Sequence, residues 1–131
     1  MSRIRGKNTK PEILVRKFLF SKGYRFRLYD KNLPGKPDII LKKYKTVIFI
    51  NGCFWHGHTG CKYFVLPKTR TKWWEEKINK TKERDSKNQS ILLADGWNVF
   101  VIWECDLKGD KSTKTLDDLI QELQLIHRSL Q

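Results

Sequence analysis

The chain has 131 residues, of which 12% are aromatic, and its 27 Lys and Arg against 14 Asp and Glu give a formal net charge of +13. This length indicates a single domain spanning residues 1–131, and the aromatic content excludes a disordered chain. A basic excess of this size favours a polyanionic partner over a merely solvated surface. We therefore expect the protein to bind nucleic acid.

The cysteine count and the apolar runs limit where the protein works. No run approaches the length of a membrane span, and the basic N-terminus lacks the apolar region of a signal peptide. Three cysteines, an odd number, argue against a disulfide framework and fit thiolate ligands in a reducing compartment. We expect a cytoplasmic monomer with no membrane partner.

The N-terminal segment predicts an arm followed by a helix. Residues 1–8 are basic and lack apolar periodicity, which is typical of an arm. The stretch from Thr9 to Glu12 has the pattern of a capping box with proline in the first turn, and Gly23 ends the helix. Its predicted buried face consists of Ile13, Leu14, Phe18 and Leu19.

The next segments predict strands. Residues 24–28 alternate as a strand does, and residues 32–37 have the composition of a loop. Residues 38–41 and 46–50 predict a hairpin, and the second strand is apolar enough to be buried on both faces. We place this hairpin at the centre of the sheet.

The C-terminal half predicts a helix over 72–94, a second central strand over 97–103, and a helix over 115–129 within a C-terminal segment that spans 108–131. The expected order is helix, three strands, helix, strand, helix. This order predicts the α/β (α+β) class, with a mixed central sheet flanked by helices.

Residues 52–61 concentrate potential metal ligands. They include Cys53, Cys61, His56 and His58, and Cys105 comes much later. Three thiolates and one imidazole close a tetrahedral Zn²⁺ site, and a site without an open position is structural. Spacing does not decide between His56 and His58. The alternative of three unrelated buried cysteines is less favoured because of the clustering.

The sequence predicts a second metal site at Asp38, which lies at a sheet edge, at the start of a predicted strand. Mg²⁺ typically takes one or two carboxylates together with phosphates and waters. Glu12, His56, Asp85 and Glu104 can approach the same edge, and an imidazole near a phosphate serves as a general base or acid. The alternative for Asp38 is a loop aspartate that forms an Asx turn.

Phe54 and Trp55 are adjacent in the glycine-rich loop. They are interpreted equally well in two ways. As a wedge, they would enter a base stack and kink duplex DNA. As packing residues, they would contact Trp73, Trp74 or Trp103.

Taken together, these residues resemble the very-short-patch repair endonucleases, the DNA mismatch endonucleases of bacteria. The resemblance runs in order through residues 2–12, 33–38, 51–56, 69–71, 83–85 and 96–105. It covers about residues 2–107, and several independent motifs in series make it specific. The tail from Lys108 onward carries no signature.

The resemblance implies a restriction-endonuclease-like fold with a structural zinc site. It implies a Mg²⁺-dependent nick in one strand, 5′ to the thymine of a T·G mismatch, that starts very-short-patch repair. The implied partner is double-stranded DNA with a T·G mismatch, with mismatch-repair proteins as candidate partners. The implied location is the bacterial cytoplasm, in association with the nucleoid.

The resemblance also assigns roles to individual positions. Asp38 matches the Mg²⁺-binding aspartate, with the Ile50 carbonyl as a second contact, and His56 and Glu12 match residues of the active centre. The matched zinc ligands are Cys53, His58, Cys61 and Cys105. Phe54 and Trp55 match the intercalating aromatics. The basic residues expected to hold DNA phosphates are Arg3, Arg5, Lys7, Lys68, Arg70 and Lys72.

Two departures from the family pattern bear on function. Asn51 stands where some members carry a second histidine of the catalytic apparatus, and the basic arm is short. They support a second hypothesis, a nuclease of the same fold without T·G preference. A third is a zinc-stabilised DNA-binding module without catalysis, against which Asp38 argues.

Overall fold

The computed structural model describes residues 9–130. The elements are α1 (Lys10–Ser21), β1 (Arg27–Leu28), β2 (Ile39–Leu41), β3 (Thr46–Asn51), α2 (Thr71–Ala94), β4 (Asn98–Trp103) and α3 (Lys111–Ser129). Short 3-10 helices follow β2 (Lys42–Tyr44) and β4 (Glu104–Leu107). The predicted order of helices and strands is therefore confirmed, whereas the predicted arm, residues 1–8, lies outside the described part of the chain.

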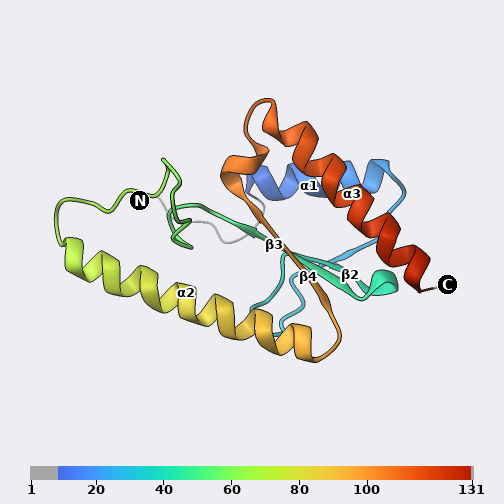
Figure 1. Ribbon diagram of the computed structural model, residues 1–131, viewed down its shortest axis with the longest axis horizontal. Helices are drawn as coiled ribbons and strands as arrows, with labels where there is room; N and C mark the ends of the chain where they lie inside the picture. Colours follow the sequence, from blue (N-terminus) through green and yellow to red (C-terminus); the bar gives the residue numbers. More distant parts are fainter. Residues whose placement is uncertain (1–8, 131) are drawn as a thin grey trace.

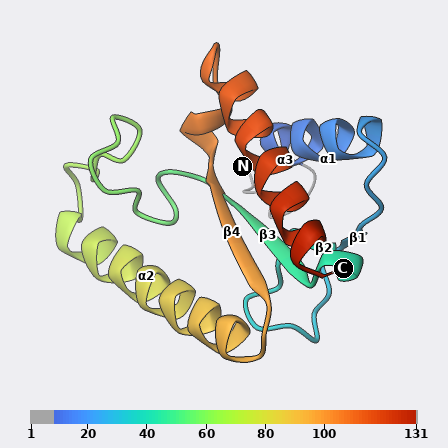
Figure 2. The ribbon, with the colours of Figure 1, turned by 45° about the vertical axis from the view of Figure 1, so that its right-hand side comes forward.

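The four strands form one mixed sheet in the order β1-β2-β3-β4. β2 pairs antiparallel with β1 and β3, which confirms the predicted hairpin, and β3 pairs parallel with β4. Asn51 lies opposite Trp103 at the ends of the parallel pair. The chain therefore leaves β3 and β4 at the same end of the sheet, as Figure 2 shows, and this end carries the functional residues.

Helices cover both faces of the sheet, with α1 and α3 on one side and α2 on the other (Figure 1). Strand side chains alternate between faces. Ile39 and Ile48 therefore join the core with α1 and α3, while Ile40 and Val47 join a smaller core with α2. Because helices cover both faces of the sheet, β3 is a nearly continuous apolar run. Among residues 9–130, no helix has both the length and the apolar character that a membrane span needs.

The buried face of α1 differs from the prediction. Ile13 and Leu14 are 36% and 39% exposed, whereas Val15, Leu19 and Glu12 are buried. The predicted face assumed that only apolar residues point inward. Because Glu12 is buried as well, the inward face is turned toward Val15, and Ile13 and Leu14 lie at its margins.

The predicted capping box also takes a different form. The Thr9 side chain makes no capping bond to the backbone of α1. Its hydroxyl instead donates to Oε2 of Glu12 at 3.1 Å. The two side chains that would cap the helix reciprocally therefore bind each other, and this contact holds Glu12 inward.

Two element boundaries and the position of one strand in the sheet were predicted wrongly. The strand over 24–28 shrinks to β1, because Tyr24 and Phe26 pack against the core from irregular backbone. The strand over 97–103 pairs with β3 alone and is therefore not central in the described sheet. Its apolar run reflects helices covering its faces, not neighbours on both edges. α3 begins at Lys111, before the predicted residue 115, because its first turn is polar and gives no apolar signal.

Candidate active site

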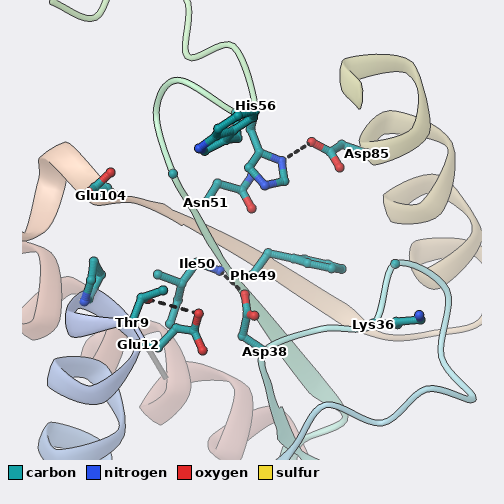
Figure 3. Close-up of a pocket in the computed structure, with 14 residues that line it drawn as sticks. Thr9, Glu12, Lys36, Asp38, Phe49, Ile50, Asn51, His56, Asp85 and Glu104 are labelled. Carbon is teal, nitrogen blue, oxygen red and sulfur yellow. Dashed lines mark hydrogen bonds and ion pairs between the residues drawn. The ribbon is translucent and has the colours of Figure 1, made fainter. Parts of the chain in front are cut away.

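A cavity of about 450 Å³ opens where β3 ends (Figure 3). It is lined by residues from α1, β3, α2, the 3-10 helix after β4 and the adjoining loops: Thr9, Pro11, Glu12, Gly35, Lys36, Asp38, Phe49, Ile50, Asn51, Gly52, Trp55, His56, Asp85 and Glu104. The five ionisable residues that the sequence placed near one sheet edge, namely Glu12, Asp38, His56, Asp85 and Glu104, all line it. The structure thus brings together side chains that are up to 92 positions apart, from Glu12 to Glu104.

Asp38 is fixed by the hairpin that it opens. Its backbone N–H donates to the Ile48 carbonyl at 3.1 Å, and its Oδ2 accepts from the Ile50 N–H at 2.6 Å. Burial raises the pKa of Asp38 to about 6, and the Glu12 charge adds to this effect. The Ile50 hydrogen bond and the charges of His56 and Arg16 act in the opposite direction.

Glu12 reaches the cavity from the first turn of α1 and is only 3% exposed. Its Oε2 accepts from Thr9, and its Oε1 accepts from Arg16 Nη2 at 3.0 Å and from the Tyr29 hydroxyl. Figure 3 shows the Glu12 and Asp38 carboxylates entering the same part of the cavity. Two carboxylates facing one space can bind a hard cation such as Mg²⁺.

His56 lies across the cavity from these carboxylates and is bound to α2. Its Nδ1 is 2.6 Å from Oδ2 of Asp85, and both side chains are about 30% exposed. A carboxylate at Nδ1 favours the tautomer with the proton on that nitrogen, so Nε2 carries the lone pair. The pair therefore presents a proton acceptor to the cavity.

Asn51 ends β3 with its side chain pointing into the cavity beside His56 (Figure 3). It is only 5% exposed. A carboxamide donates and accepts hydrogen bonds but takes up no proton near neutral pH. At this position it can orient a bound group, whereas a histidine can also transfer a proton.

The four predicted zinc ligands form a second cluster beside the cavity. The ligand atoms of Cys53, His58, Cys61 and Cys105 all lie within 4.8 Å of one another. Zinc at about 2.0–2.3 Å from each ligand sets neighbouring donor atoms about 3.3–3.8 Å apart. Cys105 Sγ and His58 Nδ1 are 3.4 Å apart, so this donor set fits Zn²⁺.

The cluster resolves the choice between the two loop histidines. The His58 ring stacks on Trp103 with centroids 4.1 Å apart and an interplanar angle of 3°. Gly57 has φ +63°, and a Cβ there would lie 2.6 Å from Cγ2 of Ile78. The loop is therefore pressed onto α2 at a glycine, with His58 turned to the cysteines and His56 to the cavity.

The aromatic pair belongs to a larger group of rings. Phe54 contacts Trp55, Phe64 and Trp74 with centroids 5.1, 6.1 and 5.5 Å apart, and Trp55 contacts Trp74 at 5.8 Å. Phe54 is half-buried, whereas Trp55 is 37% exposed and lines the cavity. Phe54 thus anchors the pair, and Trp55 presents an open face.

Of the basic residues named from the sequence, the three in the described part of the chain, Lys68, Arg70 and Lys72, do not line the cavity. Lys68, Arg70 and Lys72 are exposed around the start of α2, where the Arg70 guanidinium lies 4.8 Å from the Trp73 ring centroid. Arg3, Arg5 and Lys7 lie outside the described residues. A stripe that the sequence reasoning missed runs along α2 and consists of Lys77, Lys80, Arg84 and Lys87, all exposed.

The sequence placed Asp85 near this edge but gave it no partner, and it did not single out Arg16 or Tyr29. Arg16 follows Glu12 by four positions, a spacing that predicts a helical ion pair. Asp85 and Tyr29 lack such a signal, because they meet His56 and Glu12 only through the fold.

An open cavity with two carboxylates and a carboxylate-bound histidine, on a strongly basic chain, is the arrangement of an enzyme that cleaves nucleic acid. Residues 1–62 match the profile of DNA mismatch endonuclease Vsr. The chain is 51% identical to the type II nicking enzyme V.NmeAIP of Neisseria meningitidis over 125 residues, which cover 95% of the chain and 89% of that protein.

Two further relatives indicate the same family. The type II nicking enzyme V.XorIIP of Xanthomonas oryzae is 50% identical over 82% of the chain and 78% of its own length. The DNA mismatch endonuclease Vsr of Escherichia coli is 42% identical over 93% of the chain and 76% of its own length. The chain therefore belongs to the Vsr family of DNA-nicking endonucleases, which confirms the resemblance read from its motifs.

Proposed function

We propose that this protein is a Mg²⁺-dependent endonuclease that nicks one strand of duplex DNA, 5′ to the thymine of a T·G mismatch, and so starts very-short-patch repair. The observation that carries the proposal is the cavity in which Asp38 and Glu12 face the His56–Asp85 pair. One domain over residues 1–131 would hold both this cavity and the DNA-binding surface.

The residues of the cavity fit a Mg²⁺ site. Asp38, Glu12 and the Ile50 carbonyl would hold the ion, since Mg²⁺ prefers oxygen ligands and is bound by few protein groups. When bound, Mg²⁺ supplies charge neutralisation at a phosphate and lowers the pKa of a water. The Ile50 N–H keeps the Asp38 carboxylate in one orientation for this purpose.

His56 would handle the proton of the attacking water. Asp85 holds Nδ1, which leaves Nε2 to accept the proton, and it stabilises the imidazolium that results. Asn51 would orient the phosphate or the water by hydrogen bonds. The zinc cluster takes no part in these steps, and it fixes the loop on both sides of His56 through Cys53 and His58.

DNA binding would combine phosphate contacts with a wedge. The stripe Lys77, Lys80, Arg84 and Lys87 repeats every three or four residues and therefore shares one face of α2. Cations in such a row suit a DNA backbone and give salt-dependent affinity. Trp55, held from behind by Phe54 and Trp74, has the exposure that a wedge requires.

The test is nicking of a T·G duplex beside its T·A control, with and without Mg²⁺. We expect a single nick, only in the thymine strand of the mismatched duplex and only with Mg²⁺. Equal cleavage of both duplexes would refute the mismatch preference, and cleavage in Mg²⁺-free buffer would refute the cation requirement.

A second candidate is a nicking enzyme of the same family without T·G preference. Two observations favour it. Asn51 lines the cavity, and the relatives V.NmeAIP and V.XorIIP are named as nicking enzymes without mention of a mismatch. A panel of all mismatched pairs in one sequence context separates the two. A preference for T·G of less than about tenfold over other pairs would support the second candidate.

A further inference from the structure

The Glu12 carboxylate occupies a position where a negative charge is costly. It is only 3% exposed, and its charge raises the pKa of Asp38, so the two carboxylates are close enough to repel each other. A buried carboxylate without compensation costs several kcal/mol, on the order of the desolvation of one ion. The groups around Glu12 therefore determine whether it can remain in the cavity.

Arg16 provides the compensating charge from the next turn of α1. Its Nη2 donates to Glu12 Oε1 at 3.0 Å, and the two side chains are 15% and 4% exposed. The same guanidinium lowers the pKa of Asp38. One cation thus acts on both carboxylates, from the side of α1.

Tyr29 completes the contact from a different part of the chain. Its hydroxyl donates to Glu12 Oε1 and accepts from Arg16 Nη2, and the Arg16 guanidinium lies 5.4 Å from its ring centroid. Tyr29 has φ +55°, a left-handed conformation that costs a bulky residue about 1 kcal/mol or more. Such backbone persists where the surroundings hold the side chain in place, and Glu12 and Arg16 hold it here.

We propose that Arg16 and Tyr29 are positioning residues for the nicking reaction, which hold the Glu12 carboxylate beside Asp38 so that both carboxylates bind one divalent cation. The inference rests on the proposed function. The competing explanation is a structural clamp that only ties α1 to the segment after β1. Under that explanation, substitutions lower the stability and leave cation binding unchanged.

The test uses the full-length, zinc-loaded protein and the variants Tyr29→Phe and Arg16→Lys. The first removes one hydroxyl, and the second keeps the charge but loses the planar fork. Mn²⁺ binding is measured by electron paramagnetic resonance without DNA, and nicking rates are measured across Mg²⁺ concentrations. We expect about tenfold weaker Mn²⁺ binding, the usual effect of losing a partner of a metal ligand. The Mg²⁺ concentration for half-maximal nicking should rise by a similar factor, and saturating Mg²⁺ should restore most of the rate.

Matched controls are Tyr24→Phe and Arg25→Lys. The ring centroids of Tyr24 and Tyr44 are 5.4 Å apart, and the Arg25 guanidinium lies 5.0 Å from the Phe20 ring centroid. Neither Tyr24 nor Arg25 lines the cavity. Both controls should bind Mn²⁺ as the natural protein does. All comparisons are made below the melting temperature of each variant, which circular dichroism establishes.

The outcomes separate the two proposals. If Tyr29→Phe and Arg16→Lys melt at lower temperature but bind Mn²⁺ and require Mg²⁺ as the natural protein does, the positioning role is refuted and the clamp is structural. Unchanged melting together with unchanged Mn²⁺ binding also refutes it. If the natural protein itself binds no Mn²⁺ and does not nick, the proposed function fails, and the positioning role fails with it.

Discussion

The zinc cluster and the carboxylate cavity begin at the same point, the end of β3, and differ in almost every other respect. The cluster gathers three thiols and one imidazole within 4.8 Å, which is a complete ligand set for Zn²⁺. The cavity offers oxygen ligands and about 450 Å³ of space. A closed ligand set suits a structural role, and an open one leaves room for a substrate. A single loop serves both, since His56 lies between two zinc ligands, Cys53 and His58.

Burial acts alike on the acids of the two regions. It raises the pKa of the Cys53 thiol to about 12 and that of Asp38 to about 6. At Cys53 and at Asp38, burial therefore disfavours the anion until a cation compensates. Under the proposed function the two cations differ in role: zinc binding would stabilise the folded loop, and Mg²⁺ would serve the reaction.

The largest expected effect is from loss of zinc. Cys105→Ser, or a strong chelator, should abolish nicking and lower the melting temperature, because zinc binding contributes about 10–16 kcal/mol to folding in small zinc domains. Metal analysis should find one zinc per chain before the change and none after it. Thr59→Ala, in the same loop but not a ligand, is the control. A Cys105→Ser protein that keeps its zinc and its activity would remove Cys105 from the site.

The second largest effect is expected from a substitution of Asp38 in the cavity. Asp38→Asn should reduce nicking of the T·G duplex by about 10³-fold, on the scale of removing one electrostatic group from a transition state. Zinc content and the circular dichroism spectrum should stay the same, because the cluster does not contact this residue. Asp30→Asn is a matched control, since Asp30 accepts a hydrogen bond from the Asn32 N–H in an exposed turn. Surviving activity in Asp38→Asn would exclude Asp38 from the reaction.

A smaller effect is expected across the cavity from Asp38. Asp85→Asn should slow single-turnover nicking by about 10–100-fold, because the partner that orients His56 loses its charge. Duplex affinity, measured by fluorescence anisotropy, should change little. Asp118→Asn removes an exposed carboxylate paired with Lys114 and should leave the rate as it is. An unchanged rate in Asp85→Asn would show that His56 needs no partner.

The two regions also differ in how far the sequence predicted them. The zinc cluster was predicted almost completely, because three of its ligands lie within nine residues and Cys105 is the only other cysteine. Spacing left His56 and His58 open, the family resemblance assigned His58, and the fold places His58 with the three cysteines. The cavity was predicted in outline, since the parallel pairing of β3 and β4 brings its residues together. The partnership of His56 with Asp85 crosses 29 positions and leaves no local pattern.

The errors in the fold have a common cause. Apolar periodicity predicted α2 and β3 within one residue, because these elements bury long or continuous faces. It failed at α1, where Glu12 is buried, and at residues 24–28, where apolar side chains reach the core from irregular backbone. Periodicity assumes that polar residues face solvent, and a carboxylate held in a cavity breaks that assumption.

A final effect, on stability instead of on the nicking rate, tests whether burial of Asp38 costs free energy of folding. Without Mg²⁺, zinc-loaded Asp38→Asn should be more stable than the natural protein at pH 7.5, by up to about 3 kcal/mol, which corresponds to a pKa raised from 3.8 to about 6. The sign follows because the folded state binds the proton more tightly than the unfolded state. The natural protein therefore loses stability as the pH rises from about 4 through about 6, and the variant does not.

The measurement is urea unfolding of both proteins between pH 4.5 and pH 7.5. Subtracting the two curves cancels the titration of groups that do not interact with Asp38, so the difference reports Asp38 together with its coupling to Glu12 and His56. Addition of Mg²⁺ at pH 7.5 should stabilise the natural protein and narrow the difference, because the cation binds the ionised carboxylate. A variant that is less stable than the natural protein at pH 7.5, with a gap that closes as the pH falls, would show that Asp38 is stabilised as an anion, by Ile50, His56 and Arg16 together. The protein's own groups would then already compensate the Asp38 charge, and the cavity would not depend on a bound cation to stabilise it.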